Sequence, residues 1–455
     1  MDRIKSFFSN FSSCKTWRLL LVISFAWLVI FQPFNPKGGF KVIEWDVTLY
    51  YTYLPAFFIH QDLKFEKEWT NELGDYQLGF NLDENGNRYL KMTSGMAIMY
   101  SPFFLIAHGL TLAISPEMAT GYTTPYRAAL SFGSWIYVMF GLWLLRKVLL
   151  RFSSDKAVGW ALAIVFLGTN LLHYTVWRGA MSHGYSFMLG CAFLYLMFKY
   201  IDKQKLILII SLGLVSGLLV LIRPVNAIIP MFLGVYLLLK ILSQKDSFHF
   251  LHVLLFVLFA LVAISPQLLI WKYQTGNWVV YSYSEEGFFF NNPQIVNGMF
   301  SFRKGWLIYS PLMVFSLIGI GPLIVKNKKL GLVVLALISS ALYVTFSWWC
   351  WWYGGSFGSR PLIEYHSILA IPLVVFLQKI LEAKQGVKRI SLTVISLLIG
   401  ISIFQNYQYQ RGLIHHDSMT KEAYWKVFLL THLTDGYYES LDTPDYEKAL
   451  KGESD

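Results

Sequence analysis

The stretch KVIEWDVTLYYTYLPAFF (residues 41–58) contains the first side chains that could do chemistry, the carboxylates Glu44 and Asp46. They follow the first long apolar segment and precede a Tyr-rich stretch that we expect to be helical. Asp46 stands beside Trp45 where an apolar segment meets a polar loop, and partial desolvation there makes a carboxylate a better proton acceptor. Asp46 is therefore the first candidate for a general base, and Glu44 is the second.

The same position also fits a structural role for Asp46. An acid placed just before a helix over residues 47–58 can accept hydrogen bonds from the free N–H groups of the first turn, as an N-cap. The two roles are compatible, and both stay open at this point.

Basic residues supply the complementary chemistry, which is anion binding. Lys91 follows ENGN (84–87), a sequence typical of a tight hairpin turn, and precedes the apolar segment 94–114, whose amino end also attracts anions. Contact with lipid head groups is the alternative for Lys91. Four arginines and one lysine stand at segment ends away from the main basic clusters: Arg178, Arg223, Arg303, Lys304 and Arg360.

Arginine binds phosphate through paired N–H groups, so a cluster of this kind indicates a phosphate site. We expect Lys91 together with some of Arg223, Arg303 and Arg360 to hold phosphate, and the remaining basic residues to be structural.

Other residues are candidates for holding a substrate. They are Tyr50, Arg178, His183, Trp352 of the aromatic stretch SWWCWWYGGSFGSRP (347–361), and Glu364. An interfacial position is the alternative for His183 and an aromatic belt for the tryptophans. Neither HExxH nor DxD occurs among the outer acids, so no metal site and no cofactor are expected, although a divalent cation is left open.

Composition defines the class of protein that must position these residues. The chain has 455 residues, of which 55% are hydrophobic and 14% charged, as in an all-α polytopic membrane protein. The net charge of +11 comes from short basic clusters between apolar segments, which membrane topology explains without nucleic acid. Cys14, Cys191 and Cys350 are too scattered for a disulfide framework.

The basic clusters also predict a topology. Placing them in the cytoplasm gives about eleven transmembrane helices, with 94–114 as a re-entrant or juxtamembrane helix outside the count. A twelfth crossing by this segment is the alternative. The expected crossings are 17–34, 127–145, 157–172, 184–199, 206–222, 226–242, 250–271, 309–325, 330–346, 361–379 and 390–405.

This topology places every candidate residue on the extracytoplasmic side. A transmembrane module over 1–405, whose outer loop 35–126 carries juxtamembrane helices, is followed by a short extracytoplasmic tail over 406–455. The cytoplasmic loops are too small to hold a nucleotide-sized ligand, which argues against an enzyme that uses ATP or a sugar nucleotide.

The layout resembles the GT-C superfamily of membrane glycosyltransferases, and is similar to protein O-mannosyltransferases and bacterial aminoarabinose transferases. The likeness lies in an acid that opens the first outer loop and in four later stretches. These are YLKMTSGMAIMYSPFFLIAHGL (89–110), LVSGLLVLIRPVNAIIPMFLGVYLLL (214–239), SFRKGWLIYSPL (301–312) and WWYGGSFGSRPLIEYHSILAIPL (351–373). The first-loop acid lacks the acidic neighbour of many relatives, and no KPP triplet follows Lys91.

The resemblance implies an inverting transfer of a sugar from a polyprenyl-phosphate carrier to an acceptor hydroxyl of a glycan, lipid or protein. Asp46 would deprotonate the acceptor, and Lys91, Arg223, Arg303 and Arg360 would stabilise the phosphate leaving group. It also implies a bacterial-type inner (plasma) membrane location, with membrane lipids around the spans and no nucleic-acid partner.

Two other functions remain as alternatives. A lipid or polysaccharide transporter or flippase would carry charged residues in the middle of its spans and symmetry between its halves. A glycan polymerase or ligase that uses undecaprenyl pyrophosphate would carry its largest outer loop late in the chain. The sequence shows neither pattern.

Overall fold

The computed structural model describes residues 12–31, 42–67, 69, 79–243 and 250–453. These residues are mostly helical, and nine of their helical stretches are long and apolar enough to cross a membrane. Those stretches contain α2 (Ser13–Phe31), α5 (Gly95–Ile114), α6 (Thr124–Leu149), α9 (Ser182–Lys203), α11 (Ile228–Ser243), α12 (Phe250–Thr275), α16 (Lys328–Phe346), α17 (His366–Glu382) and α18 (Gln385–Gln410).

Three shorter apolar helices complete the bundle: α7 (Asp155–Leu167), α10 (Leu206–Ile222) and α15 (Val314–Lys326). The expectation of an all-α polytopic membrane protein is confirmed at this level, because each predicted apolar segment coincides with a helix over most of its described residues. Helices of this kind satisfy their backbone polar groups internally, which a bilayer requires.

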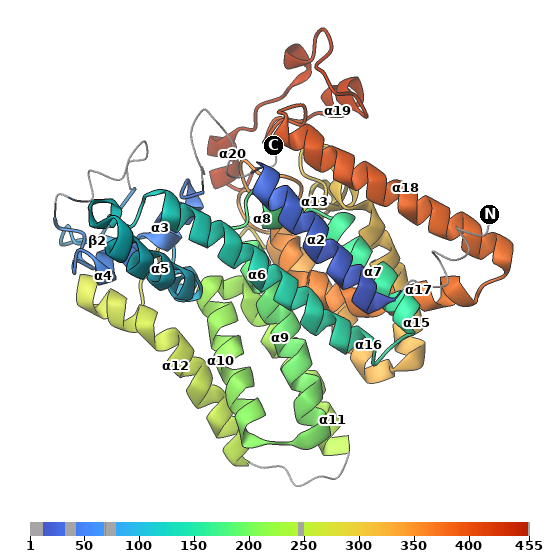
Figure 1. Cartoon of the computed structure of the whole chain (residues 1–455), viewed down its shortest axis with the longest axis horizontal. Coiled ribbons are helices and arrows are strands. Elements are labelled where there is room, and N and C mark those ends of the chain that lie inside the picture. Colours follow the sequence, from blue (N-terminus) through green and yellow to red (C-terminus); the bar gives the residue numbers. More distant parts are fainter. Residues whose placement is uncertain (1–11, 32–41, 68, 70–78, 244–249, 454–455) are drawn as a thin grey trace.

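Short elements connect the long helices and gather around one end of the bundle (Figure 1). The α-helices among them are α3 (Asp46–Tyr51), α4 (Tyr53–Phe58), α8 (His173–Val176), α13 (Ile295–Phe300), α14 (Trp306–Tyr309), α19 (Lys421–Val427) and α20 (Tyr446–Leu450). The 3-10 turns are η2 (Pro116–Met118), η3 (Pro224–Ala227), η4 (Pro311–Met313), η5 (Arg360–Tyr365) and η6 (Tyr438–Ser440).

The predicted hairpin at ENGN is confirmed. Strands β1 (Asn81–Leu82) and β2 (Arg88–Tyr89) pair antiparallel, and the Asp83 carboxylate accepts hydrogen bonds from the N–H groups of Asn85 and Asn87 in the turn between them. Gly86 supplies the positive φ of 79° that this turn needs. The hairpin delivers Lys91 to the start of α5.

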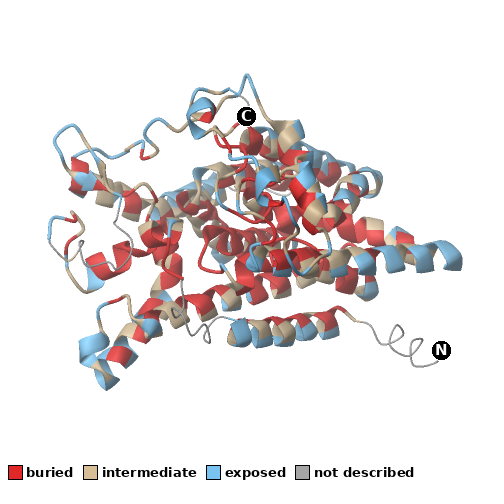
Figure 2. Ribbon diagram, turned by 90° about the horizontal axis from the view of Figure 1, so that it is seen from above, coloured by how far each residue is buried: buried red, intermediate tan, exposed pale blue. Residues whose placement is uncertain are grey.

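Helices α9 and α17 are mostly buried, whereas α12 and α18, at the edge of the bundle in Figure 1, have few buried residues. Figure 2 shows the buried residues gathered in the middle of the molecule. The apolar side chains that α12 and α18 expose are those expected to face lipid. The buried position of α9 and α17 means that His183, at the start of α9, and Glu364, in η5 directly before α17, are held in buried surroundings.

Glycines allow a close contact between the backbones of α10 and α12. Gly213 and Gly217 of α10, spaced as GxxxG, lie against the backbone of Phe256 and Ala260 in α12, where any Cβ would overlap a carbonyl oxygen. Small residues at this spacing let two helix backbones approach closely in a membrane. The two helices run in the same direction, since Gly213 meets Phe256 and Gly217 meets Ala260 four residues later.

Helix α5 has both of its ends near one end of the bundle. Gly95 at its start lies against the backbone of Leu221 and Ile222 at the end of α10. Beyond its carboxyl end, the Gly121 carbonyl accepts a hydrogen bond from the Tyr51 hydroxyl of α3. Figure 1 shows α5 beside α3, α4 and β2.

We predict that Gly217→Ala destabilises the protein although alanine is the better helix former. The new methyl group would overlap the Ala260 carbonyl, and overpacking of this kind costs about 1–3 kcal/mol. Gly234→Ala in α11 is the matched control, because a Cβ there meets open space and should leave the melting temperature unchanged or raised. Thermal unfolding of both variants in detergent tests this, and equal melting temperatures would contradict the close contact.

Candidate functional site

A cavity of about 580 Å³ opens at the end of the bundle that carries the short elements. Most of its walls come from the start of α3, the α8 segment, the loop 354–360 and the tail after α18, and α6 and α18 add Ser131 and Tyr409. Charged and titratable residues on these walls are Glu44, Asp46, His173, Arg178, Arg360, His416 and Asp417, with Tyr174, Tyr409 and Tyr446 among the aromatic ones.

Asp46 and Arg360 face each other across this cavity. The Asp46 carboxylate lies 3.4 Å from an Arg360 guanidinium nitrogen, and the two side chains are 33% and 17% exposed. The pair therefore is half-buried but open to a ligand. The N-cap of α3 is Trp45, not Asp46, and no side chain caps the helix. The capping alternative for Asp46 is therefore wrong, because its carboxylate is directed to Arg360 instead.

Glu44 makes a second ion pair on the same wall. One of its carboxylate oxygens accepts a hydrogen bond from Arg178 at 2.9 Å. The Glu44 side chain is buried, whereas the Arg178 side chain is 44% exposed and lines the cavity. Glu44 therefore orients Arg178, and the Arg178 guanidinium keeps a face that a ligand could reach.

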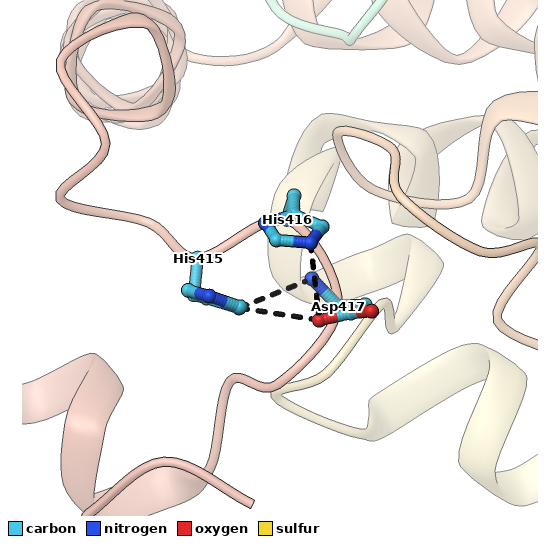
Figure 3. Close-up of side chains that lie close together, drawn as sticks. All are labelled: His415, His416 and Asp417. Carbon is cyan, nitrogen blue, oxygen red and sulfur yellow. Dashed lines mark hydrogen bonds and ion pairs between the residues drawn. The ribbon is translucent and has the colours of Figure 1, made fainter. Parts of the chain in front are cut away.

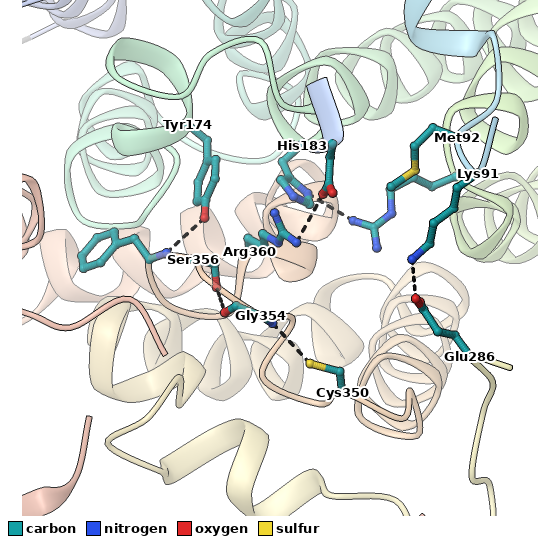
Figure 4. Close-up of polar contacts among 12 residues, drawn as sticks. Lys91, Met92, Tyr174, His183, Glu286, Cys350, Gly354, Ser356 and Arg360 are labelled. Atoms are coloured by element: carbon teal, nitrogen blue, oxygen red, sulfur yellow. Dashed lines mark hydrogen bonds and ion pairs between the residues drawn. The ribbon is translucent and has the colours of Figure 1, made fainter. Parts of the chain in front are cut away.

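Arg360 has a donor without an acceptor. Within the described part of the chain, its buried Nε–H makes no hydrogen bond. Figure 4 shows Arg360 between Tyr174 and His183. A buried donor left unsatisfied costs about 1–3 kcal/mol, so an anion that accepted this N–H would recover that cost.

A second cluster lies behind the cavity. The buried carboxylate of Glu364 accepts a hydrogen bond from Arg223 at 2.9 Å and lies 3.1 Å from Nδ1 of His183. Arg223 and His183 are themselves 3.3 Å apart. None of the three lines the cavity, so the structure places these predicted site residues together but one layer away from Asp46.

Lys91 forms an ion pair with Glu286 and lies 5.2 Å above the ring of Tyr283 (Figure 4). It does not line the cavity. Tyr50 also lies outside the cavity lining, where burial and the neighbouring Tyr283 raise its pKa. Both residues stand on elements next to Asp46 without reaching the space that Asp46 faces.

Arg303 has a different position from the one its sequence context predicted. Its guanidinium donates to the carbonyl oxygens of Asp417 and Asp442 at 2.9 Å each and pairs with the Asp442 carboxylate. Arg303 thus holds the tail and does not line the cavity. Trp352 is also part of this attachment, since it is buried against Tyr446 at 5.4 Å between ring centroids.

Lys304 is buried beside Arg303 and fastens the tail to the cavity loop. Its ammonium donates to the carbonyl oxygens of Ser356 in the loop and His416 in the tail. Burial lowers the pKa of Lys304 to about 7, an effect that Asp417 only partly offsets. The tail after α18 is therefore a wall of the cavity.

His415, His416 and Asp417 form a compact group on that wall (Figure 3). Burial would raise the pKa of Asp417, but the Ser418 hydroxyl and the two histidines hold it below its usual value. Burial together with His416 lowers the pKa of His415. At neutral pH the group thus contains one carboxylate and a neutral His415.

Sequence reasoning missed the contributions of the α8 segment and the tail to the cavity. Tyr174, Trp177, Tyr409, His416, Asp417 and Tyr446 all line it. The triplet of His415, His416 and Asp417 can be recognised in the sequence. Nothing in the sequence indicates that this part of the tail lies near Asp46. No protein-family model matches the chain, and no curated protein matches it either.

We predict that Lys304→Met loosens the tail. The substitution keeps the apolar volume but leaves two carbonyl oxygens without their donor, at a cost of about 1–3 kcal/mol for each group that stays buried. Hydrogen exchange of residues 411–453 should become faster. Lys448→Met is the control, since this exposed lysine pairs only locally with Asp445; unchanged protection in Lys304→Met would show that the ammonium does not hold the tail.

Proposed function

We propose that the protein is an integral membrane glycosyltransferase that moves a sugar from a polyprenyl-phosphate donor to an acceptor hydroxyl. One observation carries the proposal: a carboxylate and a guanidinium form an ion pair in the wall of a cavity at one end of an apolar helix bundle. An acceptor hydroxyl needs a proton acceptor, and a phosphate leaving group needs positive donors. The cavity offers both within a few ångströms.

Asp46 is the general base in this proposal. Its exposed fraction of one third lets an acceptor hydroxyl approach, and Arg360 fixes the carboxylate in place. As the acceptor oxygen attacks the anomeric carbon, Asp46 takes its proton. A single displacement of this kind inverts the configuration at that carbon, because the acceptor and the phosphate occupy opposite faces of the sugar.

Arg360 and Arg178 are the residues best placed to stabilise the departing phosphate. Both line the cavity, and negative charge that gathers on a phosphate oxygen is stabilised by preorganised N–H donors. Arg223 and Lys91 are paired with Glu364 and Glu286 outside the cavity lining, so they contribute less charge to the phosphate than Arg360 and Arg178 do. Arg303 is not assigned to phosphate, because it holds the tail.

The lipid chain of the donor would fit an apolar cavity between helices at the end of the bundle that carries the first cavity. A second, largely apolar cavity of about 450 Å³ lies between α4, α5 and α12, bounded by Tyr53, Phe57, Ala97 and Leu269. A polyprenyl chain that entered between these helices would bring its phosphate towards Asp46.

The topology belongs to the same proposal. We propose eleven crossings, with the cavity on the extracytoplasmic face of a bacterial-type plasma membrane and α5 lying at that face. The contact of Gly95 at the start of α5 and that of Gly121, seven residues beyond its end, support a helix that does not change sides.

We expect Asp46→Asn to abolish transfer, by about 10²-fold or more, because an amide cannot accept the proton. The assay is complementation of a strain that lacks the gene, with the glycan lost on deletion measured by chromatography and mass spectrometry. Asp202→Asn is the matched control, since Asp202 also pairs with an arginine, Arg151, but outside the cavity lining. Full activity of Asp46→Asn would move the base to Glu44 or refute the mechanism.

We expect a topology reporter inserted after residue 120 to report the same side as one fused after residue 453. A reporter after Gln204, between α9 and α10, should report the opposite side. If the reporter at 120 matched the one at 204 instead, α5 would be a twelfth crossing and the extracytoplasmic assignment of the cavity would fail.

A further inference from the structure

Three consecutive residues of the tail bring metal-ligating atoms together. Nδ1 of His415 lies 3.3 Å and Nε2 of His416 lies 3.5 Å from the same oxygen, Oδ1 of Asp417 (Figure 3). All three ligand atoms lie within 4.8 Å of one another. The group is separate from the Asp46–Arg360 pair but lies on a wall of the same cavity.

These spacings are close to the distances between neighbouring ligand atoms in a metal site. Zinc binds imidazole nitrogen at about 2.0–2.1 Å and carboxylate oxygen at about 2.0–2.2 Å, so two ligand atoms of a tetrahedral site are about 3.3 Å apart. Two of the three spacings in the group already have nearly this length, and closing the third needs only side-chain rotation. Two imidazoles with one carboxylate form a ligand set that suits zinc and neighbouring transition metals better than magnesium or calcium.

We propose that His415, His416 and Asp417 bind one divalent transition-metal ion of the zinc type. This ligand set is contiguous, and it therefore differs from the spaced motifs HExxH and DxD, whose absence led us to expect no metal site. Three protein ligands leave at least one coordination position open, which is the pattern of reactive and substrate-binding sites.

Surrounding contacts hold this group in place. The Asp417 carboxylate accepts hydrogen bonds from the hydroxyls of Ser418 at 2.7 Å and Tyr446 at 3.2 Å. The carbonyl oxygen of His416 is held by Lys304, and that of Asp417 by Arg303. Outer contacts that fix the ligands in this way are a regular feature of metal sites.

The open position would face the cavity. The His416 side chain is 60% exposed and lines the cavity together with Asp417. A phosphate or hydroxyl oxygen of a bound substrate could complete the metal's shell; this extension rests on the proposed transferase function, whereas the metal site itself does not.

A hydrogen-bonded cluster without metal is the competing explanation. Nδ1 of His415 accepts the backbone N–H of Ser418 at 3.1 Å, and a metal on Nδ1 would have to displace that contact. Direct binding measurements separate the two explanations, because only the metal site predicts a saturable ion that depends on all three side chains.

The test uses the full-length protein, purified in detergent with a tag free of histidine. Co²⁺ is added and followed by its visible absorption, and competition with Zn²⁺ is followed by loss of that absorption. We expect one saturable ion, and His416→Ala and Asp417→Asn should each weaken binding at least about tenfold, the lower end of the loss seen when even an outer contact is removed. His432→Ala and Asp435→Asn, both exposed in the same tail, should bind as the wild type does.

The proposal would be overturned if His416→Ala bound Co²⁺ as tightly as His432→Ala does. It would also be overturned if the wild type bound no saturable ion. Asp417→Asn retains the shape of the side chain, and the melting temperature of each variant shows whether the tail stays folded. Asp46→Asn should retain the metal. If the wild type restores no glycan to the deletion strain but still binds one cobalt ion that His416→Ala loses, the transferase proposal fails and the metal site stands.

Discussion

Charge pairing at one end of the bundle is the constraint on which the rest of this structure depends. An unpaired charge that leaves water for a protein or lipid environment is costly, and removing one member of a buried pair costs about 3–5 kcal/mol. Five of the six basic residues that the sequence offered for a phosphate site have an acidic partner from a distant part of the chain, and the sixth, Lys304, donates to carbonyl oxygens. The pairs are Glu44–Arg178, Asp46–Arg360, Lys91–Glu286, Arg223–Glu364 and Arg303–Asp442.

These pairs decide which cations remain open to a ligand. Arg223 is bound to a buried carboxylate and Arg303 is bound to the tail, so neither offers its full charge to the cavity. Arg178 has an exposed face, and Arg360 has an N–H that no described residue accepts. An anion in the cavity would meet these two first, and it would lie beside Asp46 because Asp46 is the partner that orients Arg360.

Much of this arrangement was predictable from local sequence patterns. The contacts between residues far apart in the sequence were not, because local patterns contain no information about them. Apolar runs predicted every long helix, the ENGN turn predicted the hairpin, and the position of Asp46 after the first apolar segment predicted an acid at a helix start. Arg303 was recognised in the sequence as a candidate charge. Its partner Asp442 lies 139 residues away, and the sequence around either residue does not indicate that the two pair. The GxxxG spacing in α10 can be recognised in the sequence, but the sequence does not show that α12 is the helix that packs against it.

The tail shows why the cavity needs the whole chain. Arg303 and Lys304 lie between α12 and α15, and they hold the backbone at His416 and Asp417 through carbonyl oxygens rather than through side chains. Because the cations bind the backbone, the side chains of His416 and Asp417 stay directed into the cavity. One wall of the site therefore comes from residues 44–46 and another from residues 416–417, so the Asp46–Arg360 pair is enclosed only when the last segment of the chain has docked.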